Sequence, residues 1–337
     1  MLRSRREFIA GAAGAAAAGV LAPGVSATFV GTEQASPDAI LAIFKGLPGD
    51  VAVKIYAPAV KGKSELLVQA NASKVLVIGS AVKTFILCET LRQADSPDVV
   101  KTITAQQLNL DASVWCADSA TFNPPNMIGK VSERTAMEAM ILHSDNTGTD
   151  MCLKHVGADK VRTFIASIGL KNTMIPDSIR TFIGYLYGAK NYKTFSWEDL
   201  GAAANSPFVN APLNQVQTLA SSADDLVSYY SRALQGEFFR NKETLNVFRS
   251  ILSIADAIPQ VVPLGASGFG KGGSLDIPGF HALCVAGSMV FDDRWVYFSM
   301  AINWHAAAVT DPATFQSFAS ACLHALAAVK DALSCKP

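Results

Sequence analysis

The spacing of apolar and polar positions predicts an order of elements along the chain: helix, hairpin, helical middle, second hairpin and last helix. Ser36-Pro37-Asp38 has the composition of a helix start, because a capping hydroxyl is followed by a proline and an acid. Two strand-like runs follow at residues 51–57 and 66–70, and Lys61-Gly62-Lys63 lies between them. The first part of the chain is therefore expected to form a helix and a β-hairpin.

The middle of the chain has helical spacing interrupted by two long loops. Three helices are expected here, and they run from near Ser80 through Leu91, from Ser132 to just before Ser144, and from Ser222 to Gly236. Residues 110–130 hold two adjacent prolines between asparagines and are expected to be a loop. Residues 174–217 are irregular, with little periodicity, and a connection of this kind is usually functional or disordered.

The C-terminal part predicts a second hairpin and a closing helix. Apolar runs at residues 281–290 and 295–304 flank a polar turn, and Asp311-Pro312 then opens the helix. Its apolar residues recur on one face, at Phe315, Phe318, Cys322, Leu326, Val329 and Leu333.

These elements predict an α+β fold with two lobes and a cleft between them. Strands from the two ends of the chain can join in one antiparallel sheet, and the terminal helices would cover one of its faces. This lobe would comprise residues from about 36–75 and 237–337. An inserted all-helical lobe would comprise residues from about 76–236.

The N-terminus has the composition of a removable export signal. A twin-arginine pattern at Ser4–Ile9 is followed by an Ala/Gly-rich apolar run to Val20 and by the small residues Val25-Ser26-Ala27. The alternative is a membrane anchor, but the apolar run is shorter than the roughly 20 residues that a span needs. We expect residues 1–27 to be removed and residues 28–337 to be exported folded, to the periplasm or beyond, without a stable membrane span.

Composition limits the partners of the chain. Lys plus Arg equals Asp plus Glu, at 28 each, so no excess charge indicates nucleic acid. The six cysteines form no C-x-x-C pair, and the histidines lack metal-ligand spacing, so neither a metal nor another cofactor is expected. Buried free thiols are the simplest interpretation, although an oxidising compartment permits disulfides. We expect a monomer that acts on a small molecule.

The first chemical motif is Ser80-Ala81-Val82-Lys83. At a helix start, positions i and i+3 lie on the same face, so the lysine amine can accept the proton of the serine hydroxyl. The motif alone is weak, because Ser-x-x-Lys occurs about once by chance in an average chain of this size. The alternative interpretation is a solvated helix face.

The second motif, Ser144-Asp145-Asn146, lies at a corner between two helical segments. The hydroxyl can relay a proton to a leaving nitrogen, and the amide can bind a substrate carbonyl or amide group. The alternative is a polar turn, since all three residue types favour turns.

The third motif is Lys271-Gly272-Gly273-Ser274, before an apolar strand pair. The cation can bind a substrate carboxylate, glycine lets a ligand approach the strand edge, and the Ser274 N–H can donate to an oxyanion. The alternative is a Gly-rich turn. Residues 268–273 also match G-x-G-x-x-G, but Pro278 and a strand follow where a dinucleotide site needs a helix.

Together the three motifs resemble the Ser-x-x-Lys, Ser-Asp-Asn and Lys-Thr-Gly pattern of class A β-lactamases and related penicillin-binding proteins. The segments Ile141–Val156 and Ser222–Leu226 are also similar to that superfamily, and the likeness extends from about Asp38 to Leu333. The resemblance implies a β-lactamase/transpeptidase-like fold and acyl transfer through a serine. It also implies that Ser80 is acylated and that Lys83 is the proton acceptor or relay.

The resemblance assigns the other motif residues as well. Ser144 would pass a proton to the leaving nitrogen, and Asn146 would hold the acyl side-chain amide. Lys271 and Ser274 would bind the carboxylate beside Gly273, with the Ser274 N–H in the oxyanion hole.

The chain departs from the family pattern at two places. Gly272 stands where a Thr or Ser hydroxyl is usual, and residues 175–180 lack the family's deacylating glutamate. Trp197-Glu198 resembles the family's Trp-Glu segment, although Ala202 stands where an asparagine is expected. Glu198 is therefore a candidate base, with a surface acid as the alternative.

Several other residues have candidate roles in the site. Asp177, Tyr185 and Tyr187 are rivals of Glu198 within the loop. His281 is a candidate for the cleft lining, and Trp115 and Phe122 are candidates for the pocket mouth, with core or loop packing as the favoured alternative.

The sequence thus predicts a hydrolase of the β-lactam amide bond that works through a covalent acyl-enzyme. A persistent acyl-enzyme would instead indicate a penicillin-binding peptidase, an esterase-like acyl transferase or a β-lactam binder with slow turnover.

Overall fold

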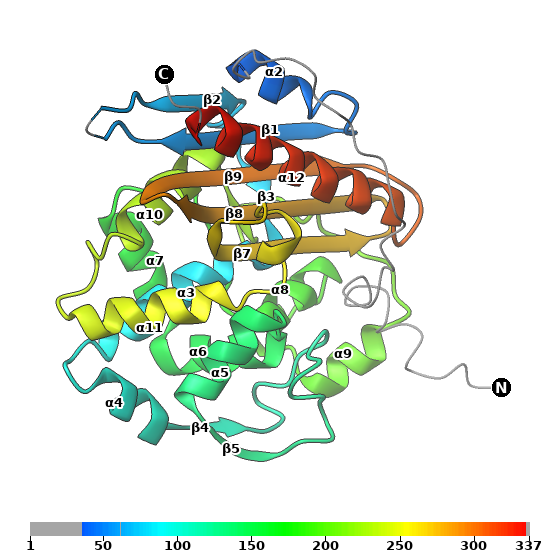
Figure 1. The fold of residues 1–337 in the computed structure, drawn as a ribbon. Helices are drawn as coiled ribbons and strands as arrows, with labels where there is room; N and C mark the ends of the chain where they lie inside the picture. The colour runs from blue at the N-terminus through cyan, green and yellow to red at the C-terminus, as the bar shows by residue number, and fades with distance from the viewer. Residues whose placement is uncertain (1–35, 61, 335–337) are drawn as a thin grey trace.

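The computed structural model describes residues 36–60 and 62–334, so the predicted export signal lies outside the described residues. Its centre is a five-stranded sheet in the order β2-β1-β9-β8-β7 (Figure 1). The strands are β1 (Asp50–Ala57), β2 (Leu66–Ala70), β7 (Ser267–Ile277), β8 (Phe280–Phe291) and β9 (Arg294–Trp304). All neighbouring pairs are antiparallel, which confirms that the two ends of the chain share one sheet.

Strand β7 is the part of the sheet that the apolar pattern did not predict. Its first seven residues include four glycines, a composition that is depleted in strands. The long antiparallel pairing with β8, from Ser267 opposite Val290 to Ile277 opposite Phe280, keeps this segment extended. The Lys271–Ser274 motif therefore lies within an edge strand, not in a turn before the sheet.

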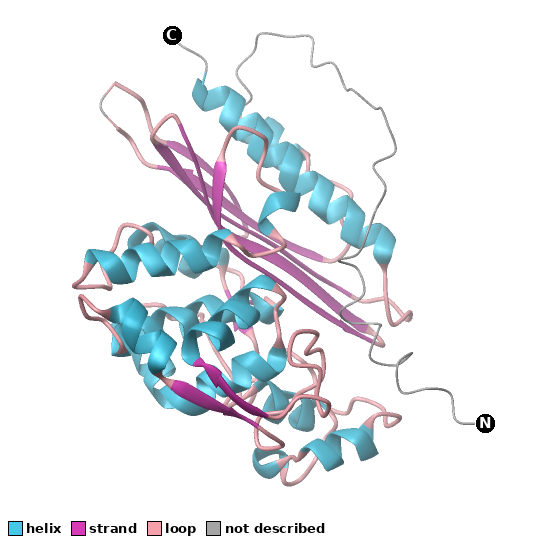
Figure 2. Ribbon diagram, turned by 60° about the horizontal axis from the view of Figure 1, so that its bottom comes forward, coloured by secondary structure: helices cyan, strands magenta, loops and turns pink. Residues whose placement is uncertain are grey.

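Two terminal helices cover one face of the sheet, as expected. They are α2 (Pro37–Ala42) and α12 (Pro312–Ser334), and Figure 2 shows the sheet between these helices and the helical lobe. Helix α12 begins after Asp311, whose carboxylate accepts hydrogen bonds from Thr314 N (3.1 Å) and Trp304 Nε1 (3.2 Å). Burial of the predicted apolar stripe along α12 holds the helix on the sheet.

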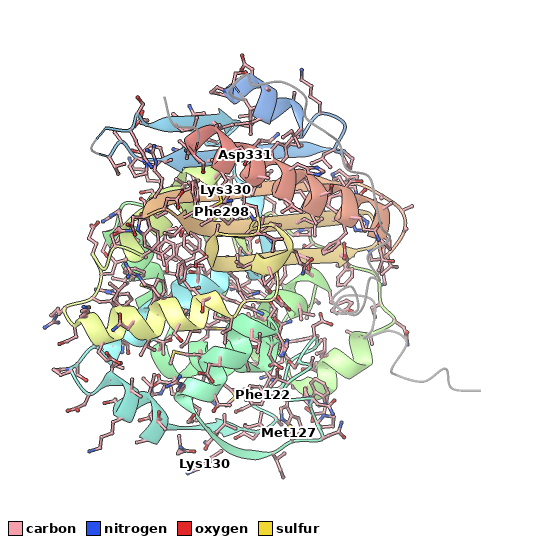
Figure 3. All side chains as sticks on the ribbon, viewed as in Figure 1. Phe122, Met127, Lys130, Phe298, Lys330 and Asp331 are labelled. Atoms are coloured by element: carbon pink, nitrogen blue, oxygen red, sulfur yellow. The ribbon has the colours of Figure 1, made fainter. Side chains whose placement is uncertain are left out.

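The helical lobe covers the opposite face. It is built from α3 (Lys83–Gln93), α4 (Val99–Ala105), α5 (Glu133–Leu142), α6 (Asn146–Val156), α7 (Ala158–Ser167), α8 (Ile179–Leu186), α9 (Trp197–Ala203), α10 (Ala223–Ala233) and α11 (Lys242–Ser253). Helix α3 is almost wholly buried. Helix α10 packs on the sheet, whereas α11 packs on both α3 and β7. In Figure 3, Phe122 lies within this lobe and Phe298 lies in the sheet.

The remaining elements are short. They are the paired strands β3 (Leu76–Val77) and β6 (Ala220–Ser221), the pair β4 (Gln107–Leu110) and β5 (Gly129–Ser132), and the 3-10 turns η2 (Gly79–Val82), η3 (Tyr192–Thr194) and η4 (Ile258–Gln260). No helix within residues 36–60 and 62–334 is both long enough and apolar enough to cross a membrane. The α+β architecture with an inserted helical lobe is confirmed, but the lobe extends beyond the predicted boundary at residue 236, because α11 packs on α3, α4 and α5.

The 174–217 segment is more ordered than its irregular sequence suggested. It contains α8 and α9, and α8 buries Phe182 and Leu186. The Asp150 carboxylate on α6 accepts hydrogen bonds from Ile179 N (2.6 Å) and Arg180 N (3.1 Å) at the start of α8. The local N-cap of α8 is Ser178, whose hydroxyl accepts from Thr181 N at 2.9 Å, whereas the added support from a distant helix leaves no local signal in the sequence.

Candidate functional site

Ser80 lies in turn η2, directly before α3, and is half-buried. The backbone that leads to it is fixed to the sheet. Asn303 on β9 accepts from Val77 N and donates to Val77 O, each at 2.8 Å, and Ile78 N donates to Leu219 O at 2.8 Å. These buried bonds hold the serine at the junction of the two lobes.

Lys83 is the first residue of α3, and its side chain is wholly buried. The Nζ donates to Ser144 O at 2.5 Å, to Ser144 Oγ at 3.2 Å and to Asn146 Oδ1 at 2.7 Å. The structure therefore brings the first two motifs together. Within the described part of the chain, Ser80 Oγ makes no hydrogen bond with Lys83 Nζ, which is one helical turn away.

The surroundings of Lys83 favour a neutral amine. Burial lowers its pKa to about 7, and the nearby charge of Lys271 lowers it too, against the opposite effect of Asp145. An amine with a pKa near neutrality can both accept and return a proton under ordinary conditions. Lys83 thus has the protonation behaviour that a base beside a serine requires.

The Ser144–Asn146 corner is held in place by its central residue. Asp145 is fully buried, and its carboxylate accepts from Gly148 N (2.8 Å), Thr121 N (2.9 Å) and Phe122 N (3.1 Å). Asp145 thus caps α6 and also fixes the preceding loop. Ser144 has a φ of 57°, a conformation that turns its hydroxyl and carbonyl oxygens toward the same amine.

Asn146 connects this corner to the loop before it. Its Nδ2 donates to Ala117 O at 3.0 Å and its backbone N donates to Asp118 O at 3.3 Å. Because Oδ1 accepts from Lys83, the amide orientation is set, and one Nδ2 hydrogen is left for a substrate carbonyl.

Strand β7 runs against the turn that carries the serine. At Gly273, an added Cβ would stand 2.7 Å from Ser80 N and 2.1 Å from Ile78 O, so only glycine allows this approach. Ser274, the next residue, is exposed on the edge strand. The third motif therefore lies beside the first, with the backbones of residues 80 and 274 close together.

Lys271 brings a second buried amine to this region. Its side chain is 1% exposed, and its Nζ donates to Gly272 O at 3.0 Å. Burial lowers the pKa of Lys271 to about 8, whereas the charge of Asp256 raises it. An anionic substrate group would favour the charged form of this lysine.

The structure also explains the missing hydroxyl at Gly272. An added Cβ there would stand 2.4 Å from Ala257 Cβ, closer than real Cβ atoms approach. Ala257 precedes turn η4, which packs on β7. A threonine or serine at position 272 therefore needs a different neighbour.

Glu198 does not join the other motif residues. It is exposed in the first turn of α9, and within the described residues its side chain makes no hydrogen bond or ion pair. Helix α9 is held near the site by the ring of Trp197, which packs edge-on against Trp115 with centroids 6.0 Å apart. The position of Glu198 matches the surface-acid alternative, and its role as a base is left as a prediction from the sequence.

The rival loop residues have structural partners. Asp177 pairs with Arg162 and accepts from Gln217 Nε2 at 2.8 Å. Tyr185 packs edge-on against a neighbouring tyrosine ring, and Tyr187 stacks on Phe208 with centroids 4.6 Å apart.

The residues considered for the cleft lining are mostly core residues. His281 is fully buried on β8, where Nδ1 bonds to Asp276 Oδ1 at 2.8 Å and the ring stacks on Trp304. Phe122 is 2% exposed and packs against Gly148. Trp115 is half-buried on the loop that carries Ala117, the residue bonded to Asn146. Of these three side chains, it is the one that lies near the motif residues.

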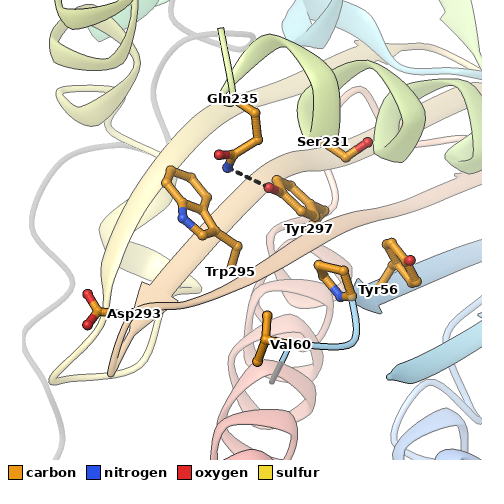
Figure 4. Close-up of a pocket in the computed structure, with 8 residues that line it drawn as sticks. Tyr56, Val60, Ser231, Gln235, Asp293, Trp295 and Tyr297 are labelled. Carbon is orange, nitrogen blue, oxygen red and sulfur yellow. Dashed lines mark hydrogen bonds between the residues drawn. The ribbon is translucent and has the colours of Figure 1, made fainter. Parts of the chain in front are cut away.

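A cavity of about 310 Å³ lies outside the motif cluster (Figure 4). It is lined by Tyr56, Pro58, Val60, Ser231, Gln235, Asp293, Trp295 and Tyr297. A second cavity of about 290 Å³ lies between α7 and residues 215–218. Neither cavity contains a motif residue, so the candidate site is defined by the motifs themselves.

The described residues contain no group of three or more His, Cys, Asp or Glu side chains that could hold a metal. Within the same residues the cysteines are buried free thiols, at Cys88, Cys116, Cys152, Cys284 and Cys322.

Two acidic residues near Lys83 lie outside the three motifs. Asp150, on α6, fixes the start of α8, and Asp118 lies on the loop beside Asn146. Burial raises the pKa of each carboxyl to about 6. Asp150 follows Asn146 by four residues, a spacing that places both on one helix face and could have indicated it from the sequence. No sequence pattern indicates Asp118.

The fold and the assembled motifs are those expected of a two-lobed serine hydrolase. A model of the β-lactamase enzyme family matches residues 37–286, and the chain belongs to that family. The resemblance inferred from the motifs is confirmed, and the family supports a serine β-lactamase type of hydrolase.

Solved structures show the same fold. A β-lactamase from Sphaerobacter thermophilus is 18% identical, with a TM-score of 0.65 over 90% of this chain and 99% of that one. A class A β-lactamase from Mycobacterium abscessus is 16% identical, with a TM-score of 0.64 over 87% and 99%. PBP-A is also 16% identical, with a TM-score of 0.64 over 88% and 96%. No curated protein matches the chain by sequence.

Proposed function

We propose that the protein hydrolyses the amide bond of β-lactams through a covalent acyl-enzyme at Ser80. The observation that carries this proposal is the buried Lys83 amine, which is shared by Ser144 and Asn146 one turn from the serine. Removing an amine from water is costly, so its burial beside a hydroxyl and an amide indicates a proton-transfer role.

Acylation begins when the Ser80 hydroxyl attacks the lactam carbonyl carbon and neutral Lys83 takes its proton. The backbone N–H groups of Ser80 and Ser274 donate to the carbonyl oxygen, which becomes negatively charged. When the C–N bond breaks, the Ser144 hydroxyl gives its proton to the leaving nitrogen and recovers one from Lys83, to which it is hydrogen-bonded.

Substrate binding uses the groups around this centre. The Lys271 ammonium attracts the substrate carboxylate along β7, beside Gly273. The free amide hydrogen of Asn146 donates to the acyl side-chain carbonyl. Gly272 supplies no hydroxyl to the carboxylate, so carboxylate binding depends more on Lys271.

A second candidate is a penicillin-binding acyltransferase or peptidase whose acyl-enzyme persists. It is favoured by the exposed position of Glu198 and by the absence of a glutamate from residues 175–180. The likeness to PBP-A, of which a point mutant was solved as an acyl-enzyme complex with penicillin G, agrees with this alternative. We also infer export through residues 1–27, which would place the protein in the periplasm or outside the cell.

The test is intact-protein mass spectrometry after mixing with penicillin G or nitrocefin. We expect a transient adduct of one acyl group, lost together with the appearance of hydrolysed product. Ser80→Ala should form no adduct. A persistent adduct would support the second candidate, and an adduct on Ser80→Ala would rule out this nucleophile.

A further inference from the structure

Three carboxylates act on the buried Lys83 amine, and they differ in how their oxygens are used. Asp145 accepts three backbone N–H groups, and Asp150 accepts two. Asp118 also acts on the Lys83 charge, but its carboxylate accepts no hydrogen bond within the described residues. Bonds from backbone N–H groups favour the charged form of a carboxylate and make it a weaker proton acceptor, and of the three only Asp118 has no such bond within the described residues.

Asp118 lies in a loop that is hydrogen-bonded to two helices, α6 and α8. Toward α6, Asn146 N donates to Asp118 O at 3.3 Å, and Cys116 N donates to Thr147 Oγ1 at 3.0 Å. Toward α8, the Arg180 guanidinium donates to Trp115 O at 3.0 Å and to Ala112 O at 2.7 Å. The loop thus joins the second motif to the 174–217 segment, and Asp118 stands between them.

The charge environment agrees with this location. Burial raises the pKa of Asp118 to about 6, and the Lys83 charge acts in the opposite direction. Burial and then the Asp118 charge raise the pKa of Tyr187, at the end of α8. The charge of Asp118 is therefore within range of Lys83 on α3, of Tyr187 after α8 and of Cys116 on its own loop.

We propose that Asp118 is the general base that activates water to release the acyl group from Ser80, the role for which the sequence offered Glu198. The proposal rests on the acyl-enzyme proposed above and assigns a residue to the second half of that reaction, the release of the acyl group. It follows from one half-buried residue whose carboxylate accepts no hydrogen bond within the described residues and whose backbone carbonyl accepts from Asn146 N, next to the amide that shares Lys83 with Ser144.

The step needs only a solvent water. A water hydrogen passes to an Asp118 oxygen as the water oxygen forms a bond to the ester carbon, and the carbonyl electron pair moves to the oxygen. The pair then returns and the bond from the carbon to Ser80 Oγ breaks. The proton on Asp118 passes to Lys83, which acylation left neutral, and Lys83 passes it to Oγ, which restores the free enzyme.

The decisive variant is Asp118→Asn. The φ of Asp118 is 55°, a conformation that asparagine adopts about as readily as aspartate, so the variant removes the charge and keeps the loop. We expect the rate of acylation by penicillin G to stay within about threefold, and release of the acyl group to slow by about 10²–10⁴-fold, the usual contribution of a general base. Both rates are followed by time-resolved intact-protein mass spectrometry on the full chain.

Two further variants separate chemistry from loop structure. Asp118→Glu moves a carboxylate by one methylene and should restore part of the release rate, which a purely structural role would not require. Asp111→Asn, on the same loop, should leave release unchanged, because the Asp111 carboxylate bonds to Ser113 N at 2.9 Å and lies outside the Lys83 cluster.

The outcomes are distinct. A stable acyl-enzyme in Asp118→Asn, with rapid release in the parent protein, supports the proposal. Release from Asp118→Asn at the parent rate overturns it, and so does a parent acyl-enzyme that never releases. If the parent protein forms no adduct with either penicillin G or nitrocefin, the acyl-enzyme function itself fails.

Discussion

The serine–lysine cluster and the 174–217 segment contain equally conspicuous polar residues, yet they are built in opposite ways. In the cluster, Lys83 is wholly buried and bonded to two other motif residues, and Gly273 is pressed against the Ser80 backbone. In the segment, Glu198 points to solvent and the adjacent Asp199 is used to cap its own short helix. Only the first arrangement fixes the position and pKa of a reacting group.

The difference separates the two halves of the proposed reaction. Acylation depends on groups that the core of both lobes holds in place, so its geometry follows from the fold. Deacylation needs one further base, and the segment that supplies it in the family's pattern contributes here a buried helix start and an exposed α9. The base is therefore to be sought on the loop between the two regions, where Asp118 lies.

The largest effect expected is from Lys83→Met, which removes the amine and keeps an unbranched buried side chain. Acylation by nitrocefin should slow by about 10³-fold, within the usual range for a general base. The melting temperature should not fall, because a buried amine is costly to desolvate and methionine is not. Stopped-flow absorbance and differential scanning calorimetry measure the two. Acylation within tenfold of the parent would show that the cluster does not supply the base.

The pH dependence of acylation tests whether the serine–lysine cluster sets the pKa of Lys83. Lys83 must be neutral to accept a proton, so the acylation rate at saturating nitrocefin should fall about tenfold per pH unit below about 7 and level off above it. Since the Lys271 charge lowers the Lys83 pKa, Lys271→Gln should move the inflection to higher pH. If the inflection stays at the same pH in this variant, the Lys271 charge does not set the Lys83 pKa.

The contrast between the regions also explains what the sequence could predict. The sheet, the terminal helices and the three motifs follow from periodicity and from spacing, which are properties of consecutive residues. The groups that complete the site act across long sequence separations: Asp150 accepts from the first N–H groups of α8, and Asn303 anchors the segment before Ser80. Strand β7 was missed because its glycines serve close packing against Ser80 and Ala257, at the cost of strand propensity.

A smaller effect is expected where the third motif departs from the family pattern. Gly272→Thr should destabilise the protein by about 1–3 kcal/mol, because the new Cβ collides with Ala257. The pair Gly272→Thr with Ala257→Gly should recover most of this loss and lower KM for penicillins by a few-fold through the added hydroxyl. Urea unfolding and steady-state kinetics of the single and double variants measure both. Equal destabilisation in the double variant would mean that Ala257 is not the obstacle.

The smallest effect is expected at Glu198, and it tests the comparison most directly. Glu198→Gln keeps the size of the side chain and removes a charge that solvent surrounds, so acylation and release should both stay within about twofold of the parent, as for most surface substitutions. The measurement is single-turnover release of the nitrocefin acyl group. A strong loss of release in this variant, with acylation intact, would mean that α9 moves onto the serine once substrate is bound. In that case the exposed acid would be the second base, and the contrast between the two regions would describe only the free protein.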